Sequence, residues 1–324
     1  MPLPPSHELR SSSTPAIASG VELSSSRELW SVGEFLAARA AENKKSSTPF
    51  LDACLIVAFS MGISKDRLLA SLSDSADSIP GDFNLAWERR LAGESVASII
   101  GEKEFYGRKF FVDQRVLIPR PDTEILVSTA LELGDSRAAF VRSETGSSEV
   151  SVVDVCTGSG AIAISLAAER PEWSLWATDI SQKALEVARL NSRRILGREL
   201  PMIQADLLEG IEKNPGSAAI LGSGWDMIVS NPPYLLSSET EQLIADGWTE
   251  PPLALDGGPD GLVIVRRLIA QASAWLKPGG FLLIETDALQ IEKVRVMFET
   301  EGFSEIRVWK DLAGLPRVSS GKAP

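Results

Sequence analysis

The sequence predicts an α/β protein: a mostly parallel sheet covered by helices and preceded by a small helical domain. Between residues 150 and 309, apolar runs typical of strands alternate with helical ones, which is the pattern of parallel βαβ units. Before residue 104, apolar residues instead recur at the spacing of helices. The chain has 324 residues, a length that favours about two domains.

Helical spacing dominates the first part of the chain, where Gly62, Pro80 and Gly81 separate the segments. We predict helices around residues 29–40, 50–61, 65–72 and 83–92. No cluster of reactive side chains occurs in this part. We therefore expect this domain either to recruit a substrate or simply to cap the domain that follows.

Aromatic and β-branched residues surround Gly107 and an Asp113-Gln114 turn, which predicts a β-hairpin between two domains. Farther along, predicted strands cover 150–155, 175–178, 202–205, 226–230, 281–285 and 306–309, and predicted helices cover 162–168, 184–196 and 262–276. The expected organisation is a disordered leader at 1–26, a helical domain at 27–104, a hairpin linker at 105–118 and the α/β domain at 119–324.

Composition excludes several classes of function. Lys and Arg total 32 against 44 Asp and Glu, and this net charge of −12 disfavours binding of duplex nucleic acid through its phosphates. The single histidine, His7, lies in the leader, so a histidine base, triad or zinc ligand is not expected. Cys54 and Cys156 are too far apart for a CxxC motif. The apolar run 51–61 is too short to cross a bilayer, and we expect a cytoplasmic protein without a membrane partner.

A glycine-rich loop follows the first strand of the α/β domain. Gly158 and Gly160 permit a tight turn and a close approach of the backbone to a ligand. Asp179 ends the second strand 21 residues after Gly158, where a carboxylate can accept the protons of two ribose hydroxyls. These features alone leave open a dinucleotide, because Gly158-x-Gly160-x-x-Ala163 also fits that fingerprint.

Asp154 favours a different cofactor, because Asp154-x-x-x-Gly158-x-Gly160 resembles the first motif of class I methyltransferases that use S-adenosyl-L-methionine (SAM). The resemblance implies a Rossmann-like, mostly parallel seven-stranded sheet. It also implies that the residues holding SAM are Cys156, Thr157, Gly158, Ser159, Gly160 and Asp179, with Asp206 and Leu207 at the adenine. For Asp206 and Leu207, a solvated turn is an equally good interpretation. We interpret Cys156 as a small packed side chain, since no cation adjoins it to stabilise a thiolate.

The fourth strand runs directly into Asn231-Pro232-Pro233-Tyr234. The prolines fix the backbone, so that the Asn231 amide and the Pro232 carbonyl are presented at the carboxyl end of the strand. These two oxygens can accept both N–H groups of a planar, weakly nucleophilic NH2, while Tyr234 offers an aromatic face. We predict that these four residues are catalytic and that Asn231 also borders the cofactor.

Several separated motifs resemble the PrmC/HemK family of protein-(glutamine-N5) methyltransferases. They are the segments 101–107, 116–124, 231–234, 250–258 with 260–262, and 311–314 with Arg317 and Val318. The resemblance implies methylation of the GGQ glutamine of peptide chain release factors. It also implies a helical domain that helps to engage the factor. We expect a monomer whose partner is a release factor, with no direct nucleic-acid partner and no metal.

Three other functions compete with this one. An enzyme that methylates exocyclic amines of adenine or guanine shares the tetrapeptide, but it needs a basic groove and stacking aromatics. A noncatalytic SAM-binding protein does not need an intact Asn231-Pro232-Pro233-Tyr234. An NAD oxidoreductase is disfavoured by Asp154 and by the missing histidine. Arg120 and Glu124 either brace the active-site entrance or form a purely structural ion pair between domains. Segment 250–258 is either a loop that faces the substrate or a connection rich in turns.

Overall fold

The computed structural model describes residues 30–146, 148–213 and 224–324. The predicted leader at 1–26 lies outside them. Contacts within the chain form two compact units, Met1–Phe83 and Asn84–Pro324. The predicted domain boundary at residue 104 stays a prediction.

From residue 30 onward the first unit contains three α-helices, as the spacing of apolar residues predicts. They are α1 (Val32–Glu42), α2 (Pro49–Ser60) and α3 (Lys65–Ala70). A capping box between Ser31 and Glu34 starts α1. In the core of this unit the ring of Phe35 meets that of Phe83 edge-on, with 5.3 Å between their centroids. The predicted helix at 83–92 is α4 (Phe83–Leu91), which begins at the division between the units.

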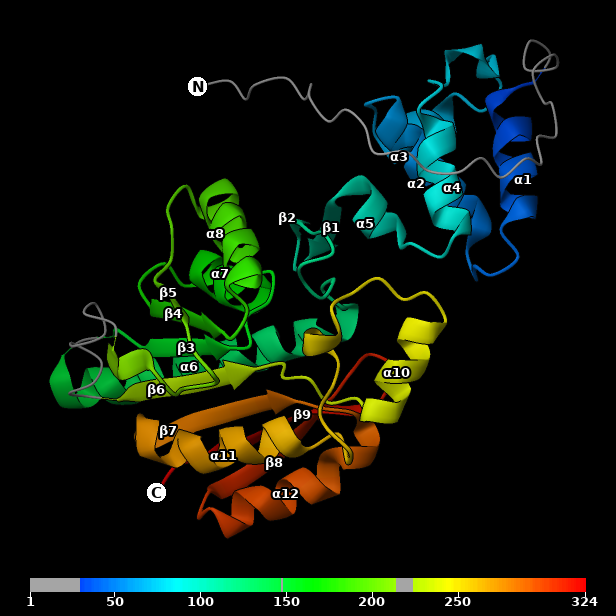
Figure 1. Cartoon of the computed structure of the whole chain (residues 1–324). Coiled ribbons are helices and arrows are strands. Elements are labelled where there is room, and N and C mark those ends of the chain that lie inside the picture. Colours follow the sequence, from blue (N-terminus) through cyan, green and yellow to red (C-terminus); the bar gives the residue numbers. More distant parts are fainter. Residues whose placement is uncertain (1–29, 147, 214–223) are drawn as a thin grey trace. The chain divides into compact units, whose positions relative to one another are not determined.

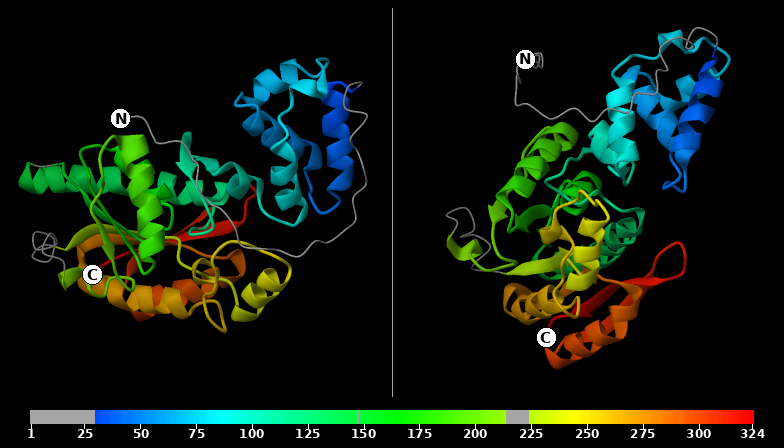
Figure 2. Two further views of the ribbon diagram at one scale, coloured as in Figure 1. Left: turned by 45° about the horizontal axis from the view of Figure 1, so that its top comes forward. Right: turned by 45° about the vertical axis from the view of Figure 1, so that its right-hand side comes forward.

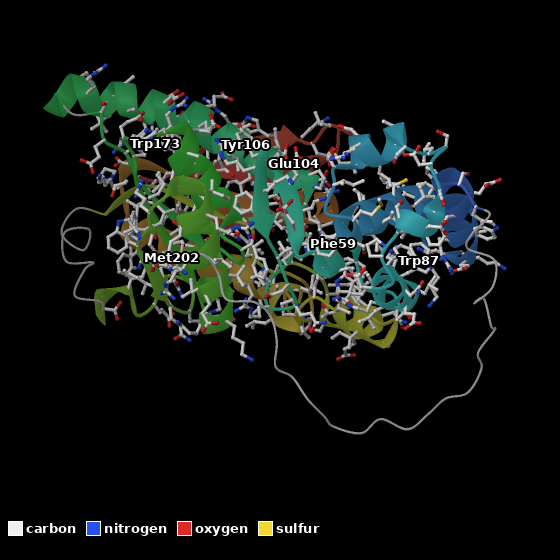
Figure 3. All side chains as sticks on the ribbon, turned by 90° about the horizontal axis from the view of Figure 1, so that it is seen from above. Phe59, Trp87, Glu104, Tyr106, Trp173 and Met202 are labelled. Carbon is white, nitrogen blue, oxygen red and sulfur yellow. The ribbon has the colours of Figure 1, made fainter. Side chains whose placement is uncertain are left out.

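A short helix, α5 (Val96–Ile100), leads into the antiparallel pair β1 (Glu102–Phe105) and β2 (Arg108–Phe111). The two strands turn at Tyr106 and Gly107, whose φ angles are 48° and 70°. Figure 3 labels Tyr106 at this turn and Glu104 on the strand before it. The Asp113-Gln114 turn lies beyond β2, where Asp113 accepts hydrogen bonds from the backbone and side chain of Arg115.

The central sheet of the second unit has seven strands in the order β5-β4-β3-β6-β7-β9-β8. The strands are β3 (Ser151–Val155), β4 (Ser174–Asp179), β5 (Met202–Gln204), β6 (Trp225–Ser230), β7 (Leu276–Glu285), β8 (Ser304–Lys310) and β9 (Pro316–Lys322). Strands β5, β4, β3, β6 and β7 pair in parallel, whereas β9 pairs antiparallel with both β7 and β8. The predicted mostly parallel seven-stranded sheet is confirmed.

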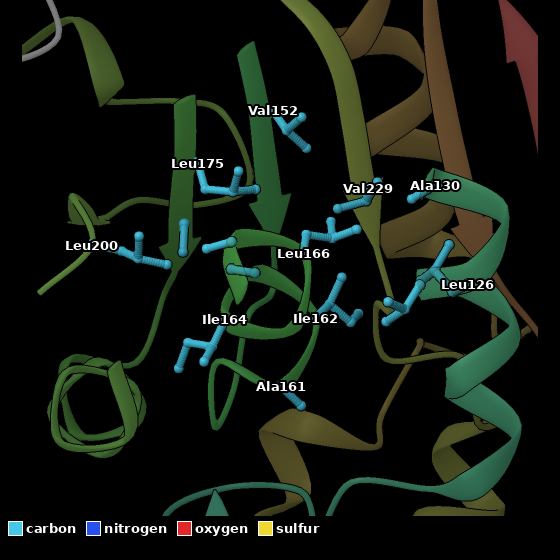
Figure 4. Packing of buried hydrophobic residues seen from close by; sticks show 14 of the residues in the cluster. Leu126, Ala130, Val152, Ala161, Ile162, Ile164, Leu166, Leu175, Leu200 and Val229 are labelled. Atoms are coloured by element: carbon cyan, nitrogen blue, oxygen red, sulfur yellow. The ribbon is translucent and has the colours of Figure 1, made fainter. Parts of the chain in front are cut away.

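Helices cover both faces of this sheet (Figures 1 and 2). They are α6 (Glu124–Thr145), α7 (Ala161–Glu169), α8 (Gln182–Leu196), α11 (Val263–Trp275) and α12 (Ile291–Thr300). A further helix, α10 (Ser237–Ala245), follows β6 along the chain. Successive residues of a strand serve opposite faces. Val152 packs in the cluster formed with α6, α7 and α8, and Val153 in the cluster formed with α11 and α12. Figure 4 shows Leu126 of α6 and Ile162 of α7 in the first cluster.

The sequence analysis places no helix or strand at five elements of the described part of the second unit, namely α5, α6, α10, α12 and β9. The 22-residue helix α6 is the longest of them. It is continuous, although it contains Gly134, a weak helix former. Gly134 is required by packing, because a Cβ built there would lie 2.1 Å from the Trp173 ring. In the described part of the chain, no helix has the length and apolar character needed to cross a membrane.

Candidate active site

The buried side chain of Asp154 stabilises the glycine-rich loop through hydrogen bonds. Its fully buried carboxylate accepts hydrogen bonds from Thr157 Oγ1 at 2.6 Å and from the backbone N–H of Ala163 at 3.1 Å. Burial raises the pKa of Asp154 to about 7. Asp154 therefore fixes the shape of the loop from within the core, and it is not among the residues that line the neighbouring pocket.

The loop itself turns through left-handed backbone conformations. Cys156, Gly158 and Gly160 have φ angles of 61°, 55° and 81°. At Gly160 a Cβ would lie 2.7 Å from Ile164 and 3.2 Å from Ala188, so the glycine lets α7 and α8 pack closely. Burial, together with nearby Asp carboxylates, raises the pKa of the Cys156 thiol well above its ordinary value. A neutral thiol agrees with our interpretation of Cys156 as a packing residue.

Asp179 stands opposite the loop at the end of β4. Its Oδ2 accepts the backbone N–H of Gly158 at 2.9 Å, and its Oδ1 accepts that of Ser181 at 2.8 Å. Burial raises the pKa of Asp179, and the two N–H donors oppose this rise. Each carboxylate oxygen offers about two acceptor sites. One site on each oxygen therefore remains for a pair of hydroxyl groups on a ligand.

A pocket opens at the carboxyl ends of the parallel strands, where ligands of open α/β sheets bind. Six of the predicted cofactor residues line it: Cys156, Gly158, Asp179, Asp206, Leu207 and Asn231. Thr157, Ser159 and Gly160 are buried in the loop behind and do not line it. Asn191 supports that hidden part of the loop, because its Nδ2 donates to the Ser159 carbonyl at 2.9 Å.

The part of the pocket after β5 has both a charged and an apolar side. Asp206 forms an ion pair with Arg267 at 2.8 Å, and both residues line the pocket. Leu207 is buried beside them and has a left-handed φ of 59°. Ile180 lines the same pocket although its side chain is 46% exposed. An exposed isoleucine in a pocket suits the flat face of a ring, so Ile180 joins Leu207 as a candidate contact for an adenine.

The tetrapeptide Asn231–Tyr234 follows β6 and is held by the segment before α11. The backbone N–H of Leu235 donates to the Leu255 carbonyl at 3.0 Å, and that of Gly257 donates to the Leu235 carbonyl at 2.8 Å. A Cβ at Gly257 would lie 2.8 Å from the Tyr234 Cα. Segment 250–258 thus packs directly against the tetrapeptide. Four of its residues also line the pocket at the loop: Pro251, Leu253, Ala254 and Asp256.

A second pocket adjoins the first. It is lined by Leu117, Arg120, Asn231, Pro232, Tyr234, Leu235, Leu243, Trp248, Ala254 and Leu255. Arg120 forms an ion pair with buried Glu250 at 2.6 Å and lies 5.7 Å from the centroid of the Trp248 ring. Asn231 lines both pockets and therefore stands where they meet. The predicted catalytic residues divide between them: Pro232 and Tyr234 line the second pocket, and Pro233 lines the first.

The sequence of this chain matches a family of known proteins. The family described as Methyltransferase small domain matches residues 137–250. A release factor glutamine methyltransferase of Burkholderia pseudomallei is 37% identical over 289 residues, which cover 89% of this chain and 97% of that one. The chain belongs to the release factor glutamine methyltransferase family. The resemblance stated from the motifs is thereby confirmed.

Further relatives carry the same name. The release factor glutamine methyltransferase of Neisseria gonorrhoeae is 42% identical over 72% of this chain and 79% of its own length. That of Moorella thermoacetica is 37% identical over 83% of this chain and 89% of its own length. Among solved structures, ribosomal protein L11 methylase of Lactobacillus delbrueckii subsp. bulgaricus is 21% identical, with a TM-score of 0.43 over 66% of this chain and 84% of that one. Membership of the release factor glutamine methyltransferase family rests on the sequence relatives alone.

SAM is the cofactor expected of a release factor glutamine methyltransferase, and the first pocket fits it. Asp179 keeps acceptor sites for a ribose diol, and Ile180, Leu207 and Ile264 give apolar surface for a purine. Within the described residues, no group of three or more His, Cys, Asp or Glu is placed to hold a metal ion.

Sequence reasoning missed two residues that contact Asn231. Glu285 ends β7, and Thr123 immediately precedes α6. Both accept hydrogen bonds from Asn231 Nδ2, at 3.1 Å and 3.2 Å. Glu285 carried a usable signal, because its carboxylate ends an apolar strand of the parallel sheet. Thr123 lies in the family motif 116–124, but only the fold brings this segment to the end of β6 and so shows its contact with Asn231.

Proposed function

We propose that this protein transfers the methyl group of SAM to the side-chain amide nitrogen, N5, of the glutamine in the GGQ motif of peptide chain release factors. One observation carries this proposal in the site itself. Asn231 stands between a pocket that fits SAM and a second pocket that leads to the same amide group. A glutamine side chain that enters the second pocket reaches the cofactor pocket at Asn231.

SAM supplies an activated methyl group on its sulfonium. The residues of this chain supply position. Asn231 Oδ1 and the Pro232 carbonyl accept the two N–H groups of the glutamine amide, which directs the nitrogen toward the first pocket. Accepting both N–H groups also stabilises the positive charge that develops on nitrogen as the new bond forms. A carboxamide is a weak nucleophile, so the step depends on its alignment. As the nitrogen gains the methyl group, the bond between that group and the sulfonium sulfur breaks, and the methylated nitrogen releases one of its two protons to water.

The lining of the second pocket suits a flat, neutral amide. Burial, with the Glu285 carboxylate adding to it, raises the pKa of Tyr234 to about 12, so its phenol stays neutral. Leu117, Leu235 and Leu255 supply apolar walls. Arg120 is occupied by Glu250, which limits its attraction for an anionic acceptor. These features favour glutamine over a phosphate-bearing group.

The proposal extends to the partner and its setting. A net charge of −12 supports a protein acceptor over bare nucleic acid. We propose that the enzyme acts as a monomer in the cytoplasm, where release factors work, and that the helical segment at 27–104 helps to engage the factor.

The test is methylation of a purified release factor with labelled SAM. The protein should label the wild-type factor, and a factor with the GGQ glutamine replaced by alanine should accept no label. Peptide mapping should place the added methyl on that glutamine. Strong labelling of nucleic acid with none of the factor would refute the proposal and favour an exocyclic-amine methyltransferase.

A further inference from the structure

The side chain of Asn231 is held by two residues from distant parts of the second unit. Its Nδ2 donates to Glu285 Oε1 at 3.1 Å and to Thr123 Oγ1 at 3.2 Å. The Thr123 hydroxyl in turn donates to the same Glu285 oxygen at 3.2 Å. The three groups form a closed triangle of hydrogen bonds. The nitrogen end of the Asn231 amide is thereby held on the side of Glu285.

This triangle fixes which end of the amide faces the pockets. An ionised carboxylate can only accept hydrogen bonds, so the nitrogen of Asn231 must face Glu285 and the carbonyl oxygen must face away. Among the described residues, none donates a hydrogen bond to Asn231 Oδ1, and Asn231 lines both pockets. The reverse orientation would bring two acceptors into contact inside the protein, where an unpaired polar group is costly.

We propose that Glu285, together with Thr123, is a positioning residue that holds Asn231 with Oδ1 directed at the amide of the methyl acceptor. The inference rests on the proposed function, in which that oxygen must accept an N–H of glutamine. Glu285 acts through Asn231 and need not touch the acceptor. Its burial fits this role, because the residue is only 1% exposed, and its Oε2 has no partner within the described residues.

The ionisation of Glu285 makes the orientation of Asn231 depend on pH. Burial raises its pKa to about 7; Arg317 of β9 opposes this rise, and Asp122 in the turn before α6 adds to it. Tyr234, after β6, also faces the carboxylate. The Arg317 guanidinium also forms ion pairs with three other carboxylates, with N···O distances of 2.9 Å to Asp311, 3.5 Å to Asp122 and 3.7 Å to Asp287. Below pH 7 a protonated Glu285 can donate as well as accept, so it no longer selects one orientation of Asn231.

Glu285→Gln is the direct test, because glutamine keeps the volume but presents either an oxygen or an NH2 to Asn231. We expect kcat for release factor methylation to fall about tenfold, while the Kd for SAM by calorimetry stays within about twofold of the wild-type value. We expect the wild-type kcat to rise about fivefold from pH 6 to pH 8, because the ionised carboxylate is the ordering form. That rise should vanish in Glu285→Gln.

Thr123 supplies a matched pair of variants. Thr123→Val keeps the shape and removes the hydroxyl, and we expect kcat to fall about fivefold. Thr123→Ser keeps the hydroxyl and should stay within about twofold of wild type. In an Asn231→Ala background, Glu285→Gln should cause no further loss of kcat, since its effect passes through Asn231. If Glu285→Gln fails to fold, the Thr123 pair and the wild-type pH profile decide.

Several results would overturn the inference. They are an unchanged kcat in Glu285→Gln, a further loss of kcat in the Asn231→Ala background, a wild-type kcat that does not depend on pH between 6 and 8, and equal activity of Thr123→Val and Thr123→Ser. Loss of SAM binding in a folded Glu285→Gln protein would show a structural role instead. If the wild-type protein fails to label the release factor, the proposed function fails and the inference with it. Labelling by the wild type combined with any of the results above overturns the inference alone.

Discussion

Asp179 at the end of β4 accepts the backbone N–H of Gly158 through Oδ2, with 2.9 Å between the two atoms. This bond ties the end of the second parallel strand to the glycine-rich loop after the first. It leaves acceptor capacity on the carboxylate that faces the first pocket. Asp179 therefore braces the loop, and we propose that it also holds the ribose of SAM.

Asp179→Ala should weaken SAM binding by roughly 10–100-fold, because hydrogen bonds to a charged group contribute about 1.5–3 kcal/mol. Calorimetry with SAM gives the Kd directly. Asp179→Asn should weaken binding less, since its amide oxygen can still accept one hydroxyl. An Asp179→Ala protein that binds SAM with wild-type affinity would place the ribose elsewhere.

Asp154 predicts a specific dependence of stability on pH. Its pKa is raised to about 7 in the fold, whereas the unfolded chain has the ordinary value near 3.9. The folded state therefore holds the proton more tightly. The contribution of Asp154 to the free energy of unfolding falls as pH rises from about 4 to 7, and it is constant above that.

Urea unfolding of the wild type and of Asp154→Asn at pH 5.5, 6.5, 7.5 and 8.5 measures this effect. The difference between the two proteins cancels the titration of the other groups. Relative to the wild type, the asparagine variant should gain stability from pH 5.5 to pH 7.5 and then level off. A difference that stays the same at every pH would contradict the buried, protonated state of Asp154.

Trp248 gives a test of the acceptor side of the site. Its ring lines the second pocket and lies under Arg120. Trp248→Ala should raise the KM for the release factor about tenfold, while the Kd for SAM stays near the wild-type value. Trp248→Phe keeps an aromatic face and should be the milder change. If Trp248→Ala instead weakens SAM binding and leaves the KM for the factor unchanged, the two pockets have been assigned the wrong way round.

Much of the site was predictable because parallel strands deliver their last residues to one edge of the sheet. Asp179, Asp206 and Asn231 each end or follow an apolar strand, and all three line the first pocket. Glu285 obeys the same rule, but its partner Thr123 is 162 residues away in the sequence, a pairing that only the fold reveals. Gly134 weakens the helical pattern of α6 in the sequence. A glycine is needed there because the Trp173 ring packs against it, and Trp173 is also distant in the sequence.

We propose above that Asn231 orients the methyl acceptor at the meeting point of the two pockets. The most direct test of this proposal is Asn231→Ala, with SAM affinity measured by calorimetry and methyl transfer to the release factor measured under saturating SAM. We expect the Kd for SAM to stay within roughly tenfold of wild type while most of the turnover is lost. Wholesale loss of SAM affinity, or turnover that survives the substitution, would contradict this account.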